Sequence, residues 1–115
     1  MSNVYEPATT PTMYFIGVTT GQSSIMKIFP GWAEKLKLRN AVIRGIDFTP
    51  HSSAKEYREA VMFIKNDPFS MGALVTTHKI DLFNTCKDLF EYIDPYAEKL
   101  GEVSSISKSD SKLCV

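Results

Sequence analysis

A short stretch in the middle of the chain combines residue types that can do chemistry. The stretch at 72–79 reads Gly-Ala-Leu-Val-Thr-Thr-His-Lys, so an apolar run is followed by two hydroxyls, an imidazole and an amine. The apolar part is typical of a buried strand, and the polar part is typical of the loop after it. Because α/β proteins bind ligands at the carboxyl ends of their strands, we expect a ligand site in this loop.

A second polar turn, at 19–24, follows the apolar run 13–18. Ser23 and Ser24 close the turn and precede an apolar pattern of helical period, so either serine can cap that helix. A helix start offers free amides and the positive end of the helix dipole, and serine hydroxyls add donors to such an anion site. The turn is therefore either an anion-binding site or a simple helix cap.

The elements that position these residues alternate along the chain. Apolar runs at 13–18, 41–48 and 73–76 predict three buried strands, and 103–106 predicts a last short strand. Helical patterns lie between them, one of which starts with a capping box formed by Ser53 and Glu56. Pro30 predicts a kink or break in the first helix. This alternation predicts an α/β fold, a three-layer αβα sandwich with a mostly parallel sheet.

Length and composition limit the organisation of the chain. Its 115 residues fit one small domain, for which we predict a flexible arm at 1–12, a folded part at 13–107 and a tail or truncated linker at 108–115. Thirteen basic and thirteen acidic residues balance, which argues against a nucleic acid or an anionic membrane as a partner. We expect no membrane span and no signal peptide, because no run of apolar residues is long enough.

The cysteines and histidines indicate neither disulfides nor a metal. Cys86 and Cys114 are too few for a disulfide framework and fit a reducing cytoplasm. Together with His51 and His78 they do not form a recognisable set of metal ligands. We therefore predict a cytoplasmic protein without a bound metal.

Three blocks of the sequence, at 17–26, 72–79 and 94–106, together resemble the amino-terminal, substrate-binding domain of the shikimate dehydrogenase family. The family's first motif is Gly-x-Pro-Ile-x-His-Ser-x-Ser-Pro, in which the two serines bind the substrate carboxylate. Gly17 and Ser23 match it, whereas Ile25 stands where the second serine would be. The resemblance implies that Ser23 contacts the substrate, with Ser24 as a neighbour that could replace the missing hydroxyl.

The second block resembles the family motif Asn-Val-Thr-x-Pro-x-Lys. Lys79 aligns with the catalytic lysine, which assists proton transfer from the hydroxyl being oxidised, while Leu74 replaces the asparagine. The resemblance thus implies that Lys79 is catalytic and that Thr76 and Thr77 contact the substrate. A lysine suits this role because burial and neighbours can lower its pKa toward neutrality. The alternative is a surface lysine at the start of a helix.

The third block resembles Asp-x-x-x-x-Ala-x-x-x-Gly-Ala-Val-Asn-Thr. Asp94, Ala97, Gly101 and Val103 fit this pattern, and Ser104 occupies the position of an asparagine that contacts substrate hydroxyls. The resemblance implies a substrate contact for Ser104, although serine reaches less far than asparagine. A differently shaped substrate, or none, is an alternative.

The resemblance implies the substrate-binding domain of an NADP-dependent oxidoreductase of aromatic amino acid biosynthesis. Such an enzyme reversibly oxidises a ring hydroxyl on a small carboxylated cyclic substrate. The six glycines never fall at Gly-x-Gly-x-x-Gly spacing, so we expect an NADP-binding domain in cis or in trans, with no cofactor held and no activity by this chain alone. The alternatives are a freestanding carboxylate-binding or partner-docking module and a degenerate, non-catalytic homologue. A homodimer is also left open.

Overall fold

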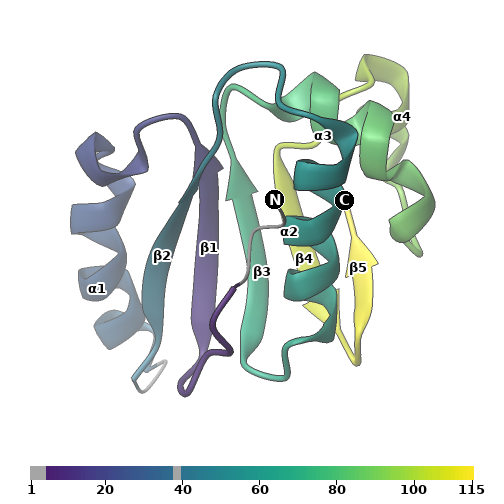
Figure 1. The fold of residues 1–115 in the computed structure, drawn as a ribbon. Helices are drawn as coiled ribbons and strands as arrows, with labels where there is room; N and C mark the ends of the chain where they lie inside the picture. The colour runs from purple at the N-terminus through teal and green to yellow at the C-terminus, as the bar shows by residue number, and fades with distance from the viewer. Residues whose placement is uncertain (1–4, 38–39) are drawn as a thin grey trace.

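The computed structural model describes residues 5–37 and 40–115. In these residues five strands form one sheet in the order β2-β1-β3-β4-β5 (Figure 1). The strands are β1 (Thr12–Gly17), β2 (Val42–Asp47), β3 (Ser70–Val75), β4 (Ser105–Ser109) and β5 (Lys112–Cys114). β1 pairs in parallel with both β2 and β3, whereas β4 pairs antiparallel with β3 and with β5.

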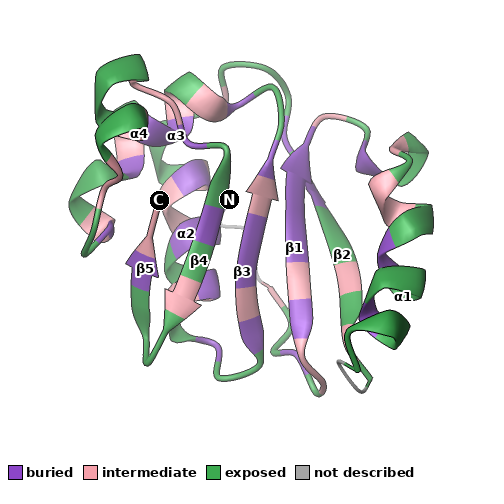
Figure 2. Cartoon of the chain, turned by 180° about the vertical axis from the view of Figure 1, so that it is seen from behind, coloured by how far each residue is buried: buried purple, intermediate pink, exposed green. Residues whose placement is uncertain are grey.

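The helices flank this sheet. They are α1 (Ile25–Lys35), α2 (Ala54–Asn66), α3 (Lys79–Cys86) and α4 (Pro95–Leu100), with short 3-10 turns η1 (Thr20–Gln22) and η2 (Lys87–Leu89). Figure 1 shows α2 in front of the sheet, and Figure 2 shows from behind that α1 flanks the edge strand β2. The predicted αβα fold class with a mostly parallel sheet is therefore confirmed. Among the described residues, no helix is long and apolar enough to cross a membrane.

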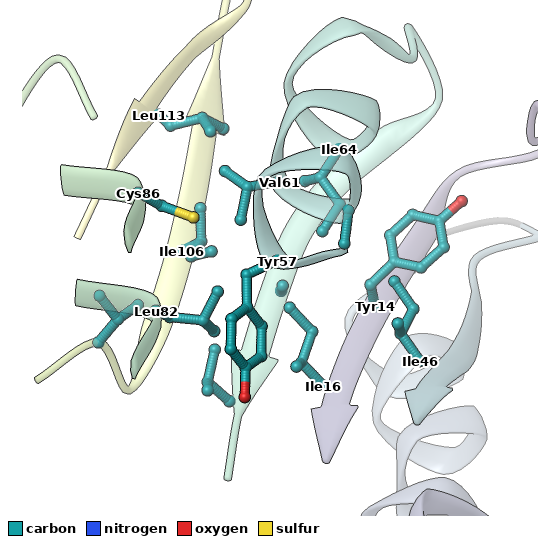
Figure 3. Packing of buried hydrophobic residues seen from close by; sticks show 14 of the residues in the cluster. Tyr14, Ile16, Ile46, Tyr57, Val61, Ile64, Leu82, Cys86, Ile106 and Leu113 are labelled. Carbon is teal, nitrogen blue, oxygen red and sulfur yellow. The ribbon is translucent and has the colours of Figure 1, made fainter. Parts of the chain in front are cut away.

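The main core lies between α2 and the sheet (Figure 3). Alternate residues of β1 and β3 face α2, and the helix presents residues spaced three and four apart, as the two periodicities require. The central members of this core are Tyr14, Ile16, Ala73 and Val75 of the sheet and Tyr57, Ala60, Val61 and Ile64 of α2. The four α2 residues are fully buried.

The prediction of a tail at 108–115 is wrong. β4 continues to Ser109, and a turn through Asp110 and Ser111, both with positive φ, leads into β5. Positive φ at both central residues is the geometry of a two-residue hairpin turn. Leu113 on β5 is fully buried in the core, so these residues belong to the fold.

Other sequence-based expectations also need correction. Of the predicted flexible arm 1–12, residues 1–4 lie outside the described part, while Ala8 and Thr12 are buried. The amide of Ala8 donates to Asp67 Oδ2 at 2.8 Å, which fixes this segment to the end of α2. Pro30 does not break α1, which runs as one helix through it. Trp32 is 51% exposed, because Phe29 and Ala33 form the buried side of α1.

Glu91 fastens the carboxyl-terminal strand to α2. Its Oε2 accepts a hydrogen bond from Lys65 Nζ at 2.6 Å, and its Oε1 accepts one from the amide of Leu113 at 2.8 Å. The ammonium of Lys65, and after it the amide of Leu113, lower the pKa of the Glu91 carboxyl below its usual range. A lowered pKa in the folded state adds stability that is complete above the unfolded pKa of about 4.3 and disappears as pH falls through the folded value.

We expect Glu91→Gln to reduce stability at pH 7 and to flatten its dependence on pH between about 5 and 3. At the acid end of this range both proteins carry a neutral side chain, so their stabilities should converge. Urea unfolding at several pH values measures this difference. Glu34→Gln, at an exposed position of α1, is the matched control. A constant difference between Glu91→Gln and the wild type over the whole range would contradict the prediction.

Candidate functional site

The loops after β1 and β3 meet at the carboxyl ends of these two parallel strands and enclose a cavity of about 160 Å³. Parallel strands bring the loops at their carboxyl ends to the same edge of the sheet, which is where α/β proteins bind ligands. The cavity thus lies where the stretch 72–79 predicted a site. Its lining residues are Phe15, Gly17, Val18, Thr19, Thr20, Ser23, Thr76 and Thr77.

Gly17 allows the two loops to approach closely. A Cβ atom at this position would lie 2.9 Å from Cγ2 of Thr76 and 3.1 Å from Cγ2 of Thr20. The amide of Thr76 donates to the carbonyl oxygen of Ile16 at 2.9 Å, so the ladder between β1 and β3 continues up to the cavity. Because Gly17 has no side chain, the loops after β1 and β3 can lie this close together. The hydrogen bond at Thr76 fixes the second loop to β1.

Asp47, at the end of β2, holds the loop after β1. Its Oδ1 accepts hydrogen bonds from the amide of Thr20 at 3.0 Å and from the hydroxyl of Thr20 at 2.6 Å. The threonine side chain lies over Gly45, where an added Cβ would be 1.8 Å from its Oγ1. Asp47 thus caps the loop after β1.

Four hydroxyls of the cavity remain available to a ligand. The side chains of Thr19, Ser23, Thr76 and Thr77 make no hydrogen bond within the described part of the chain. The cavity wall contains no charged side chain, so recognition rests on hydroxyls, which donate and accept, and on amides near the start of α1. Residues 5–37 and 40–115 contain no group of three or more acidic, histidine or cysteine residues that could hold a metal ion.

Thr77 has a φ of +66°. This left-handed conformation is strained for a β-branched residue, and such strain persists only where surrounding structure imposes it. The following residue supplies the constraint, because the amide of His78 donates to the carbonyl oxygen of Thr76 at 2.6 Å. The turn holds Thr77 in the cavity wall, where its backbone alone would not favour it.

His78 is the buried residue of this loop. A histidine in a polar loop usually lies in solvent, yet this one is 1% exposed. The hydroxyl of Tyr57 lies 2.8 Å from Nδ1 of His78, and Nε2 lies 3.1 Å from the carbonyl oxygen of Gly17. A carbonyl can only accept, so Nε2 carries a proton and donates to Gly17, while Nδ1 shares a hydrogen bond with the hydroxyl of Tyr57. Burial raises the pKa of Tyr57, which keeps its hydroxyl protonated.

The other predicted site residues lie outside the cavity. Ser24 is exposed at the first position before α1 and has helical backbone angles, so its hydroxyl makes no cap bond. Lys79 is the first residue of α3 and is half-buried, but it does not line the cavity. The carbonyl oxygen of Ser104 accepts from the amide of Val75 at 2.9 Å, and the residue lines a separate cavity of about 230 Å³.

Comparison with known proteins relates this geometry to one enzyme family. No family model matches the sequence, and a comparison with curated proteins finds no match. Among solved structures, a shikimate dehydrogenase in complex with NADP⁺ shares 26% identity with this chain at a TM-score of 0.70, over 99% of this chain and 35% of its own. The Listeria monocytogenes shikimate 5-dehydrogenase, solved with shikimate and NAD, shares 18% identity at a TM-score of 0.74, over 97% of this chain and 36% of its own.

A neighbour of different specificity has the same fold. It is the 5-ketofructose reductase of Gluconobacter sp. strain CHM43, with 16% identity and a TM-score of 0.71, over 91% of this chain and 35% of its own. The chain thus spans about a third of the length of each of these structures. Its resemblance to shikimate dehydrogenases is confirmed, and its fold is consistent with a divergent form of their amino-terminal domain.

Proposed function

We propose that this chain is the substrate-binding part of a shikimate-dehydrogenase-like, NADP-dependent oxidoreductase. The observation that carries the proposal is the cavity in which Ser23, Thr76 and Thr77 present unpaired hydroxyls at the carboxyl ends of β1 and β3. These three residues were expected at the site from the family motifs alone. The substrate would be a small cyclic molecule with a carboxylate and ring hydroxyls.

The carboxylate would lie at Ser23, near the start of α1. The helix has no acidic residue in its first turn, so nothing there opposes the favourable interaction of an anion with the helix dipole. Thr76 and Thr77 would then contact the hydroxyls of the ring from the loop after β3. This arrangement fixes the ring between two loops that the sheet already holds in place.

Lys79 would assist proton transfer, although it does not line the cavity. It lies at the start of α3, two residues after Thr77, and its side chain has no hydrogen-bond partner among the described residues. Its long, flexible stem gives the ammonium group the reach to approach a ring held at Thr77. The ketone or alcohol of the substrate would have to extend beyond the cavity toward α3.

NADP, which would supply or accept the hydride, would bind to another domain. The glycines of this chain do not follow the spacing of a loop that cradles a dinucleotide phosphate. The end of the sheet toward which β1 and β3 point also carries α3 and α4 (Figure 1). Large apolar residues there are exposed, namely Ile80 at 55%, Tyr96 at 76% and Leu100 at 65%. Such a surface suits contact with the NADP-binding domain.

A titration with shikimate tests the site. We expect saturable binding at about millimolar affinity, and Ser23→Ala should weaken it about tenfold, because one hydrogen bond to a charged group is lost. Ser24→Ala is the matched control, since it removes a neighbouring hydroxyl that does not line the cavity. Chemical shifts of backbone amides report both the affinity and the place of binding.

Two outcomes would count against this assignment. If the wild type shows no saturable shift with shikimate, or if both serine variants bind equally well, the carboxylate is not held at Ser23. D-fructose serves as a second probe, because the wall lacks a charged side chain and one structural neighbour reduces a keto sugar. Binding of fructose without binding of shikimate would favour an uncharged polyol or ketose as substrate.

A further inference from the structure

We propose that a second cavity, on the side of the sheet that faces α2, binds a small planar monocarboxylate. This cavity has a volume of about 420 Å³ and lies over the edge strand β2. Its size falls within the range of small-molecule sites. The proposal rests on four of its lining residues, Tyr5, Tyr14, Arg44 and Phe63.

The cavity is separate from the one at Ser23. Tyr14 and Phe15 are neighbours on β1, so their side chains point to opposite faces of the sheet. Phe15 lines the cavity at Ser23, whereas Tyr14 lines the larger one. Arg44 is the residue of β2 that pairs with Tyr14 in register, and it therefore shares the α2 face. The inference thus stands independently of the proposed substrate site.

The hydroxyl of Tyr14 is a buried polar group without a partner. The residue is 4% exposed, and its oxygen makes no hydrogen bond within the described part of the chain. In Figure 3 the ring points its hydroxyl away from Ile16 and the rest of the core. Burial raises the pKa of Tyr14, so the group stays a donor at neutral pH. A buried donor without an acceptor is unfavourable, and a ligand oxygen would satisfy it.

Arg44 supplies the charge for a carboxylate. It is exposed on β2 and forms no ion pair among residues 5–37 and 40–115. It lies close enough to Tyr14 to counteract the rise of the tyrosine pKa. A guanidinium binds a carboxylate through two parallel hydrogen bonds, and a tyrosine hydroxyl can donate a third. The pair therefore matches the oxygens of one carboxylate.

An aromatic wall accounts for the planar body of the ligand. The ring of Tyr5 stacks on Phe63 at a centroid distance of 5.2 Å, and Tyr14 meets Phe63 edge-on at 5.7 Å. Glu6 and Asp47 also line the cavity, and Oδ1 of Asp47 is already bound by Thr20. Two carboxylates beside one guanidinium disfavour a multiply charged anion such as phosphate. A planar ring with a single carboxylate would pack against the aromatic wall and bind Arg44 with less repulsion than a multiply charged anion.

Benzoate is the probe that tests the site, with binding followed by amide chemical shifts and by the melting temperature. We expect saturable binding at up to about 10 mM and a loss of affinity of about tenfold in Arg44→Gln. Benzyl alcohol, which has the same ring and no charge, should bind more weakly than benzoate. Lys55→Gln, at an exposed position of α2, removes one positive charge elsewhere and should bind benzoate normally.

Tyr14→Phe separates a binding role from a structural one. Since it removes the unpaired hydroxyl and keeps the ring, the variant should melt at a higher temperature without ligand and should lose benzoate affinity. Ser23→Ala should leave benzoate binding unchanged, which distinguishes this site from the substrate cavity. The proposal is overturned if benzoate does not saturate the wild type, or if Arg44→Gln and Tyr14→Phe both bind it as the wild type does.

Discussion

Gly72→Ala is expected to lower the free energy of unfolding by more than about 3 kcal/mol, one of the largest effects available in this chain. Gly72 has a φ of +128°, a conformation that side chains rarely adopt. An added Cβ would lie 2.1 Å from the carbonyl oxygen of Ile106 on β4. That atom belongs to the backbone, so the clash cannot be relieved by rotating a side chain.

The position of Gly72 in the sheet makes relaxation costly. The register of β3 against β1 shifts between Thr12 and Met13, so Met71 is an extra residue on β3, as in a β-bulge. Gly72 also pairs with Ser107 of β4. If β4 moves away, it takes Ile106 and, through β5, Leu113 out of the core. The penalty therefore combines local strain with loss of core packing.

Urea unfolding of the purified variant measures this effect. Gly31→Ala is the matched control, because Gly31 lies inside α1 and an added Cβ would meet nothing within 4 Å. That control should gain about 0.5–1 kcal/mol, since alanine favours the helix over glycine. A loss of less than about 1 kcal/mol in Gly72→Ala would show that β4 can move without disturbing the core.

The parts of the fold that local patterns determine could be predicted from the sequence. The capping box is one case, because the hydroxyl of Ser53 accepts from the amide of Glu56 at 3.3 Å and donates to its carboxylate at 3.1 Å. The buried face of α2 follows from its spacing in the same way. The hairpin of β4 and β5 could not be predicted in this way, because its strands are short and mostly polar, with one buried core residue each, Ile106 and Leu113.

The sequence predicted the position of the candidate site but only some of the residues that line it. Both loops follow apolar strands, so Ser23 and Thr76 were expected together, and the structure brings them together. Ser24 differs from Ser23 by one residue at a helix start, and that rotation turns it away from the cavity. Ser104 does not line the cavity, and its carbonyl oxygen accepts a hydrogen bond from Val75 at the end of β3. This placement depends on how β3 and β4 pair, which the spacing of residues does not reveal.

His78 shows most clearly what a sequence pattern cannot show. A histidine after two threonines looks like a solvated loop residue, but its burial depends on Tyr57, which lies 21 positions earlier. His78→Leu is expected to lower the free energy of unfolding by about 2–4 kcal/mol, because two buried partners lose their hydrogen bonds. The carbonyl oxygen of Gly17 would lose its donor from Nε2.

The hydroxyl of Tyr57 would lose its partner at 2.8 Å and keep only the long bond to Oδ2 of Asp81 at 3.5 Å, while the amide of Ser52 still donates to it at 3.2 Å. Tyr57→Phe removes only that hydroxyl and should lower the free energy of unfolding by about 1–2 kcal/mol. The double variant should then lose less than the sum of the two single losses, because both remove the same bond. Equilibrium unfolding of all four proteins gives this coupling energy directly.

The hydrogen bonds of His78 should also affect the candidate site, although His78 does not line the cavity. His78 ties the end of β1 at Gly17 to the loop that holds Thr77 in its strained conformation. We therefore expect His78→Leu to weaken shikimate binding at temperatures where the variant is still folded. His78→Gln should restore part of the affinity, since its amide can donate to the Gly17 carbonyl. Additive losses in the double variant, together with wild-type binding in His78→Leu, would mean that the imidazole merely fills space.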